Sequence, residues 1–174
     1  GDVQEHEIIL RTLGYSSVRI TDTRALSSCT HLIIPGGEST VIAKLMEETG
    51  VDKLIREKVN NGFLAVFGTC AGAILLAKNA NGKHAPKTLG LIDIDVDRNA
   101  YGTQAQSFRT SLEVKDIGTI EAAFIRAPII TRVGESVEVL AQLQNDPVIV
   151  KSGKILAATC HPELCDEVAI HSMF

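Results

Sequence analysis

The sequence lacks several features that mark particular protein classes. It has no Trp, only 4% aromatic residues and no long basic run, so base-stacking platforms and a nucleic-acid partner are not expected. No apolar stretch approaches the ~18 residues needed to span a bilayer, and the first residues do not have the layout of a signal peptide. A net charge of −4 gives no electrostatic reason to expect a membrane-surface partner. These absences leave a soluble globular protein.

The cysteine content and the length indicate the compartment and the number of domains. Four cysteines in a chain with no targeting segment indicate a reducing compartment, where thiols are free, catalytic or metal-bound. The 174 residues are 45% hydrophobic, enough for one core, and no repeat or linker divides them. We therefore expect a single domain, residues 1–174, in the cytoplasm.

The order of hydrophobic segments predicts an α/β fold. Continuous apolar runs at 31–34 and 64–67 are typical of buried parallel strands, and a short strand is expected over 17–20. Helical patterns cover 2–13, 40–48, 52–60, 71–77 and the last residues, 166–174. Further strands are expected over 91–97, 106–114, 122–126, 137–143, 148–151 and 155–159. Short turns join several of these, which indicates some antiparallel pairing. The sequence predicts a three-layer domain with a mixed sheet.

The sharpest local motif is G-T-C-A-G at 68–72, between a buried strand and a helix. It is a G-x-C-x-G version of the nucleophile elbow, in which a tight turn presents the central Cys70 side chain. Flanking glycines relieve clashes that a Cβ would create, and a helix N-terminus favours the thiolate. The backbone N–H of Ala71 would point where an oxyanion forms. The alternative is that Cys70 is a small buried residue beside packing glycines.

A second motif, H-P-E, follows the last predicted strand. In an extended chain His161 and Glu163 project from the same face, and Pro162 disfavours helix for the residue before it. A histidine base beside a carboxylate that orients it is the logic of Cys-His-acid catalysis. Alone the motif is a weak signal, since a surface histidine beside a glutamate is common; with a cysteine elbow in the same chain it becomes much stronger.

The third motif, P-G-G-E-S-T at 35–40, ends a buried strand. Its two glycines allow the backbone to approach a ligand, and Ser39 or Thr40 can cap the next helix. A plain strand-to-helix turn would have the same sequence. A phosphate loop is not expected, because no Gly-Lys-Ser/Thr ending follows.

A zinc site is the alternative interpretation of the C-terminal region. Cys160, His161, Cys165 and His171 are four potential ligands, although their spacing does not match a paired C-x-x-C knuckle. The remaining cysteine and histidines, Cys29, His6, His31 and His84, receive no functional role from the sequence.

Taken together, these segments resemble the triad-type glutamine amidotransferases, and among them the glutaminase subunits of pyridoxal 5′-phosphate synthase. The resemblance extends over nearly the whole chain. The motifs that carry it recur in the same order: P-G-G-E-S-T, G-T-C-A-G, R-N-A-Y-G at 98–102, Q-S-F at 106–108, F-I-R-A-P at 124–128 and H-P-E-L at 161–164.

The resemblance implies a flavodoxin-like, mostly parallel glutaminase domain that hydrolyses L-glutamine to L-glutamate and ammonia. Cys70 would be the nucleophile, His161 the general base and acid, and Glu163 the residue that orients it. The oxyanion donors would be Gly37 and Ala71. The glutamine-binding residues would be Gly36, Gly37, Glu38, Arg98, Ile125 and Arg126.

The resemblance also implies a partner. The ammonia would pass to a separate synthase subunit, which makes pyridoxal 5′-phosphate (vitamin B6) from a pentose phosphate and a triose phosphate. The chain itself should need no metal and no cofactor. Departures from the family pattern are Gln106 in place of a usual Asp, Cys160 in place of a usual Phe, and an absent first strand, which in the family ends in Leu-Gln-Gly.

Three alternatives stay open at the level of the sequence. The chain could be another triad glutaminase, such as that of imidazole glycerol phosphate synthase, against which R-N-A-Y-G and I-R-A-P argue. It could be a non-catalytic module that binds a synthase, although Cys70, His161 and Glu163 are all in place. A metal-binding regulator is the third.

Overall fold

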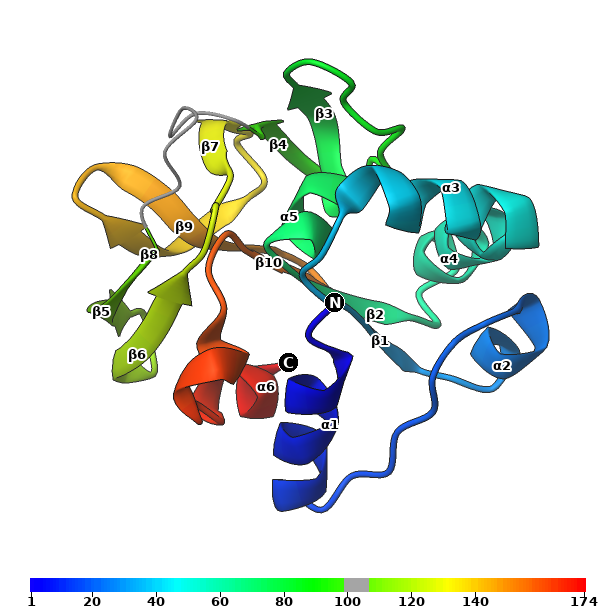
Figure 1. The fold of residues 1–174 in the computed structure, drawn as a ribbon, viewed down its shortest axis with the longest axis horizontal. Helices are drawn as coiled ribbons and strands as arrows, with labels where there is room; N and C mark the ends of the chain where they lie inside the picture. The colour runs from blue at the N-terminus through cyan, green and yellow to red at the C-terminus, as the bar shows by residue number, and fades with distance from the viewer. Residues whose placement is uncertain (99–106) are drawn as a thin grey trace.

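A computed structural model describes residues 1–98 and 107–174 (Figure 1). Most of the R-N-A-Y-G motif, residues 99–102, and the departure at Gln106 lie outside the described residues.

The described residues alternate between helices and strands in the first half and are mainly strands in the second. The helices are α1 (Val3–Thr12), α2 (Thr23–Ser27), α3 (Ser39–Thr49), α4 (Val51–Asn60), α5 (Ala71–Leu76), the 3₁₀ helix η1 (Pro162–Cys165) and α6 (Ala169–Met173). The strands are β1 (His31–Ile34), β2 (Ala65–Thr69), β3 (Ala77–Asn81), β4 (Ile92–Asp97), β5 (Phe108–Val114), β6 (Gly118–Phe124), β7 (Ile129–Val133), β8 (Glu138–Leu143), β9 (Asp146–Ser152) and β10 (Ile155–Ala158).

Parallel strands form the centre of the main sheet, whose order is β1-β2-β10-β9-β8. β2 pairs in parallel with β1 on one side and with β10 on the other, whereas β9 and β8 continue the sheet with antiparallel pairing. The register places Ile34 opposite Gly68, and Thr69 opposite Ala158. The carboxyl ends of all three parallel strands therefore meet at one edge of the sheet.

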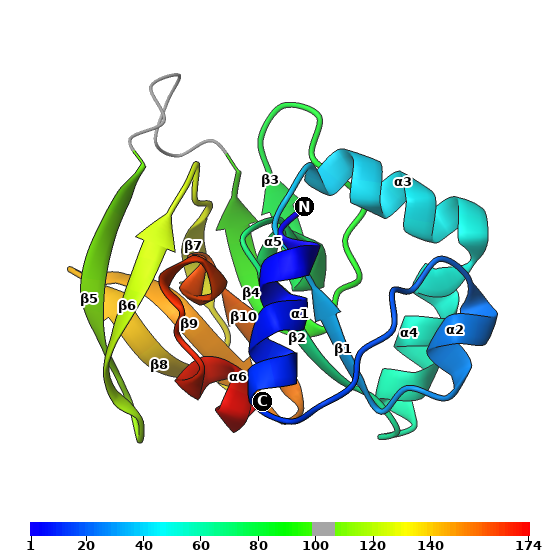
Figure 2. The same cartoon turned by 60° about the horizontal axis from the view of Figure 1, so that its bottom comes forward.

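The main sheet separates two hydrophobic clusters, because successive side chains of a strand point to opposite faces. Val66 of β2 belongs to the cluster shared with α2, α4, α5, β4 and β7, whereas the next residue, Phe67, belongs to the cluster shared with β5, β6, β8 and α6. Figure 2 shows α1 and α6 lying together on this second side. The expected three-layer α/β fold, with mixed and largely parallel pairing at its centre, is confirmed.

Two smaller sheets account for the remaining strands. β3, β4 and β7 form a three-stranded sheet with β4 in the middle, and β5 and β6 form an antiparallel hairpin. Because β7 and β9 contact one another, the three-stranded sheet lies against the main sheet.

Some local predictions were wrong. Residues 17–20, expected as a strand, are irregular: Val18 is exposed, and β1, the edge strand of the main sheet, pairs only with β2 among the described residues. A strand needs a neighbour for its backbone groups, and 17–20 has none within the described part of the chain. The expected helix over 71–77 ends at Leu76, where β3 begins. The strand β7 and the helix α2 were not anticipated.

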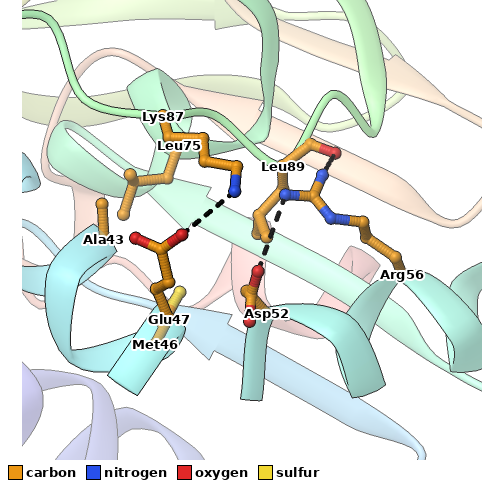
Figure 3. A pocket seen from close by; sticks show the side chains of 8 residues that line it. All are labelled: Ala43, Met46, Glu47, Asp52, Arg56, Leu75, Lys87 and Leu89. Atoms are coloured by element: carbon orange, nitrogen blue, oxygen red, sulfur yellow. Dashed lines mark hydrogen bonds and ion pairs between the residues drawn. The ribbon is translucent and has the colours of Figure 1, made fainter. Parts of the chain in front are cut away.

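Polar contacts join the segment after β3 to helices α3 and α4, around a small pocket (Figure 3). Arg56 donates hydrogen bonds to the carbonyl oxygens of Leu89 and Thr88, and the Lys87 ammonium lies 3.1 Å from a Glu47 carboxylate oxygen. The volume of the pocket is about 10 Å³, room for one water at most. These contacts hold the connection to β4 and do not form a ligand site.

None of the helices within residues 1–98 and 107–174 has both the length and the apolar content of a membrane span.

Candidate active site

The site lies where the three parallel strands end. Chain segments that leave β1, β2 and β10 at this edge carry Gly36, Cys70 and His161, respectively. The backbone N–H of Cys70 donates to the carbonyl oxygen of Ala158 at 2.8 Å, which ties the turn after β2 to the end of β10. Ligand sites at the carboxyl ends of parallel strands are a general property of open α/β sheets.

The elbow predicted from G-T-C-A-G is present. Cys70 has φ 48° and ψ −100°, a conformation that non-glycine residues rarely adopt, and it directly precedes helix α5. A Cβ at Gly72 would lie 2.0 Å from the carbonyl oxygen of Ile34, and one at Gly68 would lie 2.5 Å from the backbone of Gly72. Both glycines are required because strand and helix pack at this distance.

His161 and Glu163 form the expected pair, although by a different backbone route. The Nδ1 of His161 lies 2.8 Å from Oε1 of Glu163. The chain is not extended here: Pro162–Cys165 forms the 3₁₀ helix η1, which turns the glutamate back toward the ring. A backbone bridge fixes the histidine, because its N–H donates to the carbonyl oxygen of Ala123 in β6 at 2.7 Å.

Burial and hydrogen bonding set the charges of the pair. Burial alone would lower the pKa of His161, but hydrogen bonds with Cys70 and with Glu163 outweigh it and raise the pKa to about 10. Burial would raise the pKa of Glu163, but its hydrogen bonds with His161 and His6 lower it to about 2. At neutral pH the site therefore holds a protonated imidazole beside an ionised carboxylate.

Among the cysteines, the environment singles out Cys70. Burial raises the pKa of the Cys160 thiol well above its usual range, and burial also raises the pKa of Cys165. Cys70 lies beside the imidazole of His161, and its Sγ lies 3.9 Å from the carbonyl oxygen of Ile125. Cys70 is thus the cysteine that has a histidine beside it, the arrangement that a cysteine nucleophile needs.

Gly36 is in direct contact with the histidine. A Cβ at this position would lie 2.4 Å from Cε1 of His161 and 2.7 Å from Oδ2 of Asp2. The lack of a side chain therefore makes room for the imidazole. Gly37 has φ 140°, which a side chain would strain.

Glu38 and Arg98 form an ion pair beside this loop. Arg98 Nη2 lies 3.0 Å from Oε1 of Glu38, and its Nη1 donates to the carbonyl oxygen of His84 at 2.6 Å. Glu38 also accepts hydrogen bonds from the hydroxyl and the N–H of Thr40, and these, with Arg98, lower the pKa of Glu38. Glu38, and neither Ser39 nor Thr40, is therefore the N-cap of α3.

Ile125 lies next to Cys70 in the structure, and Arg126 follows it along the chain. Both are exposed, and Arg126 has φ 47°, a strained left-handed conformation. The carbonyl oxygen of Ile125 is the atom that faces Cys70 Sγ. The structure thus brings Ile125 to the nucleophile, and it places Glu38 and Arg98 together.

Two buried histidines for which the sequence predicts no role lie behind Glu163. His6 Nε2 lies 3.4 Å from Glu163 Oε1 and 3.2 Å from Thr69 Oγ1, and its Nδ1 lies 2.8 Å from Nε2 of His171. One signal was available: His6 and Ile9 share the buried face of α1, three residues apart. The sequence does not reveal the partners of that histidine, because they are far away along the chain.

The four residues considered for zinc are not brought together. Within the described residues, the one group of three potential ligands with atoms within 4.8 Å of one another is Asp2, His161 and Glu163. Asp2 Oδ2 lies 3.2 Å from the same Nδ1 that binds Glu163. A cation here would compete with the histidine–glutamate pair, so the donor set serves an acid–base pair better than a metal.

An α/β fold with a cysteine elbow and a buried His-Glu pair at the carboxyl edge of its sheet defines the class of triad-type amidotransferases. The chain belongs to the SNO glutamine amidotransferase family, whose sequence profile matches residues 1–174. The prediction of a glutamine amidotransferase enzyme is therefore confirmed.

Similar proteins with assigned names support the same family. The pyridoxal 5′-phosphate synthase subunit PdxT of Thermotoga neapolitana is 48% identical over 176 residues, which cover all of this chain and 93% of the relative. The protein of the same name from Thermus thermophilus is 45% identical over 174 residues, covering 100% of this chain and 91% of the relative. The resemblance to the glutaminase subunits of pyridoxal 5′-phosphate synthase is thus confirmed.

Solved structures support the fold. A crystal structure described as a glutamine amidotransferase superposes with a TM-score of 0.95 at 45% identity, covering 99% of this chain and 92% of the other. A glutamine amidotransferase from Thermotoga maritima, 14% identical, has a TM-score of 0.61 over 91% of this chain and 69% of the other, which shows the shared fold alone.

Proposed function

We propose that Cys70, His161 and Glu163 are the catalytic triad with which this amidotransferase hydrolyses L-glutamine to L-glutamate and ammonia. One observation carries the proposal: a strained elbow places Cys70 beside His161, whose Nδ1 is bound to a buried carboxylate.

In the first half-reaction the Cys70 sulfur attacks the side-chain amide carbon of glutamine. A protonated imidazole beside a sulfur favours the thiolate, which is the nucleophile. His161 then gives its proton to the leaving nitrogen, so that ammonia departs and a thioester remains. In the second half-reaction His161 takes a proton from water, whose oxygen attacks the thioester carbon. The C–S bond breaks, glutamate leaves, and the thiolate beside the protonated His161 is restored.

The oxyanion of each tetrahedral intermediate needs donors that are already in place. Ala71 is the first residue of α5, so its N–H belongs to the helix end that no intrahelical carbonyl satisfies. We assign it and the N–H of Gly37 as the donors. Gly37 follows the strand that ends beside the elbow, and its positive φ is a conformation in which a peptide turns at low steric cost.

The same edge of the sheet supplies charges for the ends of the amino acid. Arg98 can bind the α-carboxylate and Glu38 the α-ammonium, which would replace the present ion pair between the two side chains. Gly36 and Gly37, with Ile125 next to Cys70 and Arg126 after it, complete the proposed binding residues.

The partner of this chain is, in our proposal, the synthase subunit of pyridoxal 5′-phosphate synthase. The names of relatives up to 48% identical support it. The chemistry also favours a partner, because ammonia released into neutral water is mostly protonated and no longer nucleophilic. We further propose that residues 1–174 form one glutaminase domain and that it acts in the cytoplasm, as the four free cysteines indicate.

Partner binding should switch the glutaminase on. The test measures steady-state glutamate production by this chain with and without a saturating synthase subunit. Loss of one oxyanion donor costs about 10²–10³ in kcat, so a Gly37 peptide that turns only in the complex would give activation of that size. Equal rates in both conditions would refute the switch. Failure to bind the synthase subunit, with glutamine still hydrolysed, would refute the partner and point to another acceptor of ammonia.

A further inference from the structure

The Glu163 carboxylate is held by more groups than the triad requires. Its Oε1 lies 2.8 Å from Nδ1 of His161, 3.2 Å from Oγ1 of Thr69 and 3.4 Å from Nε2 of His6. The side chain of Glu163 is fully buried, so it has no water shell to orient it. Its position is therefore set by these protein donors, two of which take no part in bond making.

His171 holds the ring of His6 in place. His6 Nδ1 lies 2.8 Å from Nε2 of His171, and only 4% of the surface of either residue is exposed. Phe67 forms T-shaped contacts with both rings, at centroid distances of 6.3 and 5.4 Å. His6 comes from α1 and His171 from α6, the two helices that lie together in Figure 2.

The direction of the hydrogen bonds follows from the ionised carboxylate. Glu163 can only accept, so the single hydroxyl proton of Thr69 is donated to it. The Thr69 oxygen is then an acceptor for His6, and the Nε2 of His6 must carry a proton. Donors from α1 and from the end of β2 thus converge on the oxygen that binds His161.

Burying two histidines and a threonine hydroxyl around Glu163 costs free energy of folding, which indicates that these groups have a function. Burying imidazoles and a hydroxyl in a core cluster gives up their hydration, and apolar side chains of similar size would fill the same space without that penalty. The Nδ1 of His171 also has no hydrogen-bond partner among the described residues. Packing alone does not explain why histidines stand at these two positions.

We propose that His6, held in place by His171, is a positioning residue of the active site: its Nε2–H, which faces both Thr69 Oγ1 and Glu163 Oε1, fixes the Glu163 carboxylate so that Oε1 faces His161. The inference rests on the proposed role of the triad. It assigns a function to helices α1 and α6, which cover the second face of the sheet and carry no residue that touches glutamine in the proposed mechanism.

The consequence for the charges of the site can be derived. The titratable groups that face His161 are Cys70, Glu163 and Asp2. Those around the glutamate are His6, with His171 behind it, and the thiols of Cys160 and Cys165. Without the His6 donor the carboxylate is free to turn and supports the imidazolium less well. The pKa of His161 should then fall, and the alkaline limb of the pH–rate profile should move to lower pH.

Three variants separate positioning from packing. His6→Leu keeps an apolar side chain in the space but removes the donor. His6→Gln keeps a donor, because its amide nitrogen reaches about as far as Nε2. Ile9→Val is the control: it trims a buried residue on the same face of α1, so it loosens the helix without touching the carboxylate.

Each variant, with the synthase subunit present, is assayed for glutamate production over a range of pH and for thermal unfolding. We expect His6→Leu to lower kcat about tenfold or more, the size of effect that outer partners have at metal-bound histidines. In His6→Leu, KM should be unchanged and the alkaline limb of the pH–rate profile should move to lower pH. His6→Gln should recover most of the wild-type kcat, and Ile9→Val should retain it. Wild-type kcat and pH profile in a folded His6→Leu would overturn the proposal, as would an equal loss in Ile9→Val.

A second readout does not depend on turnover. The proton on Nδ1 of His161, hydrogen-bonded to a carboxylate, should give a far-downfield ¹H resonance, which His6→Leu should move upfield and Ile9→Val should not. If the wild type hydrolyses no glutamine, the proposed function fails, and this resonance alone decides the inference. If His6→Leu does not fold, His171→Leu, which leaves the donor in place but removes its support, should give a smaller change in the same direction. An unchanged resonance in the folded variant would overturn the proposal.

Discussion

Gly36→Ala should disable the active site by displacing His161. The new Cβ would lie 2.4 Å from Cε1 of the imidazole, whereas ordinary contacts between such atoms are 3.4–4 Å. The ring or the loop must therefore move by about 1 Å to restore a normal contact. Because φ of Gly36 is not in the positive region, the effect of the substitution is steric and not a backbone strain.

A misplacement of about 1 Å can cost about 10²-fold in rate, or roughly 2.7 kcal/mol of transition-state stabilisation. We therefore expect kcat for glutamine hydrolysis to fall about 100-fold with KM changed only slightly. The assay is glutamate production in the presence of the synthase subunit, with thermal unfolding measured in parallel.

The control is Gly14→Ala, at the end of α1, where a Cβ meets nothing within 4 Å although φ is 84°. It should lower stability and leave kcat unchanged. The steric argument would be refuted by a Gly36→Ala variant with wild-type kcat. A rise in KM with kcat unchanged would also refute it, because Gly36 would then act only through its proposed contact with glutamine and not by making room for His161.

Two further predictions concern the His-Glu pair. Glu163→Gln should lower kcat less than His161→Ala does, by at most about 10⁴-fold, which is the loss found when the acid of a Ser-His-Asp triad is neutralised. The double variant should be little slower than His161→Ala. If the two losses multiply instead, the residues act independently. Because the folded-state pKa of Glu163 is lowered from 4.5 to about 2, its ionisation contributes about 3 kcal/mol of stability that is present above pH 4.5 and lost as the pH falls toward 2. Urea unfolding between pH 7 and pH 3 should therefore show a steeper loss of stability in the wild type than in Glu163→Gln, and equal slopes would contradict the assigned pKa.

The sequence was most informative where the residues that form a functional feature follow one another directly along the chain. The elbow could be predicted because a buried strand, two glycines and a helix follow one another directly along the chain, so local geometry alone fixes Cys70. The strands β1, β2 and β10 could be predicted from their continuous apolar runs, and their parallel pairing places Cys70 and His161 at one edge.

What the sequence could not supply depends on contacts between distant segments. His6 and Glu163 are far apart in the chain, and nothing local to the helix indicates that the histidine meets a carboxylate. The strand expected over 17–20 failed for the same reason: its composition suits a strand, but pairing depends on a neighbour. The extended H-P-E segment failed because proline is also compatible with the first turn of a 3₁₀ helix, which is the conformation found.

The most direct test of the assigned chemistry compares the wild type with Cys70→Ala in the presence of the synthase subunit. Removing a small, buried thiol should leave the fold and the binding of the synthase subunit intact. The wild type should release glutamate and ammonia in equal amounts, and a glutamine-derived electrophile should attach to Cys70 and to none of Cys29, Cys160 and Cys165. Cys70→Ala should release neither product. Glutamate production by a folded Cys70→Ala variant would contradict the assignment.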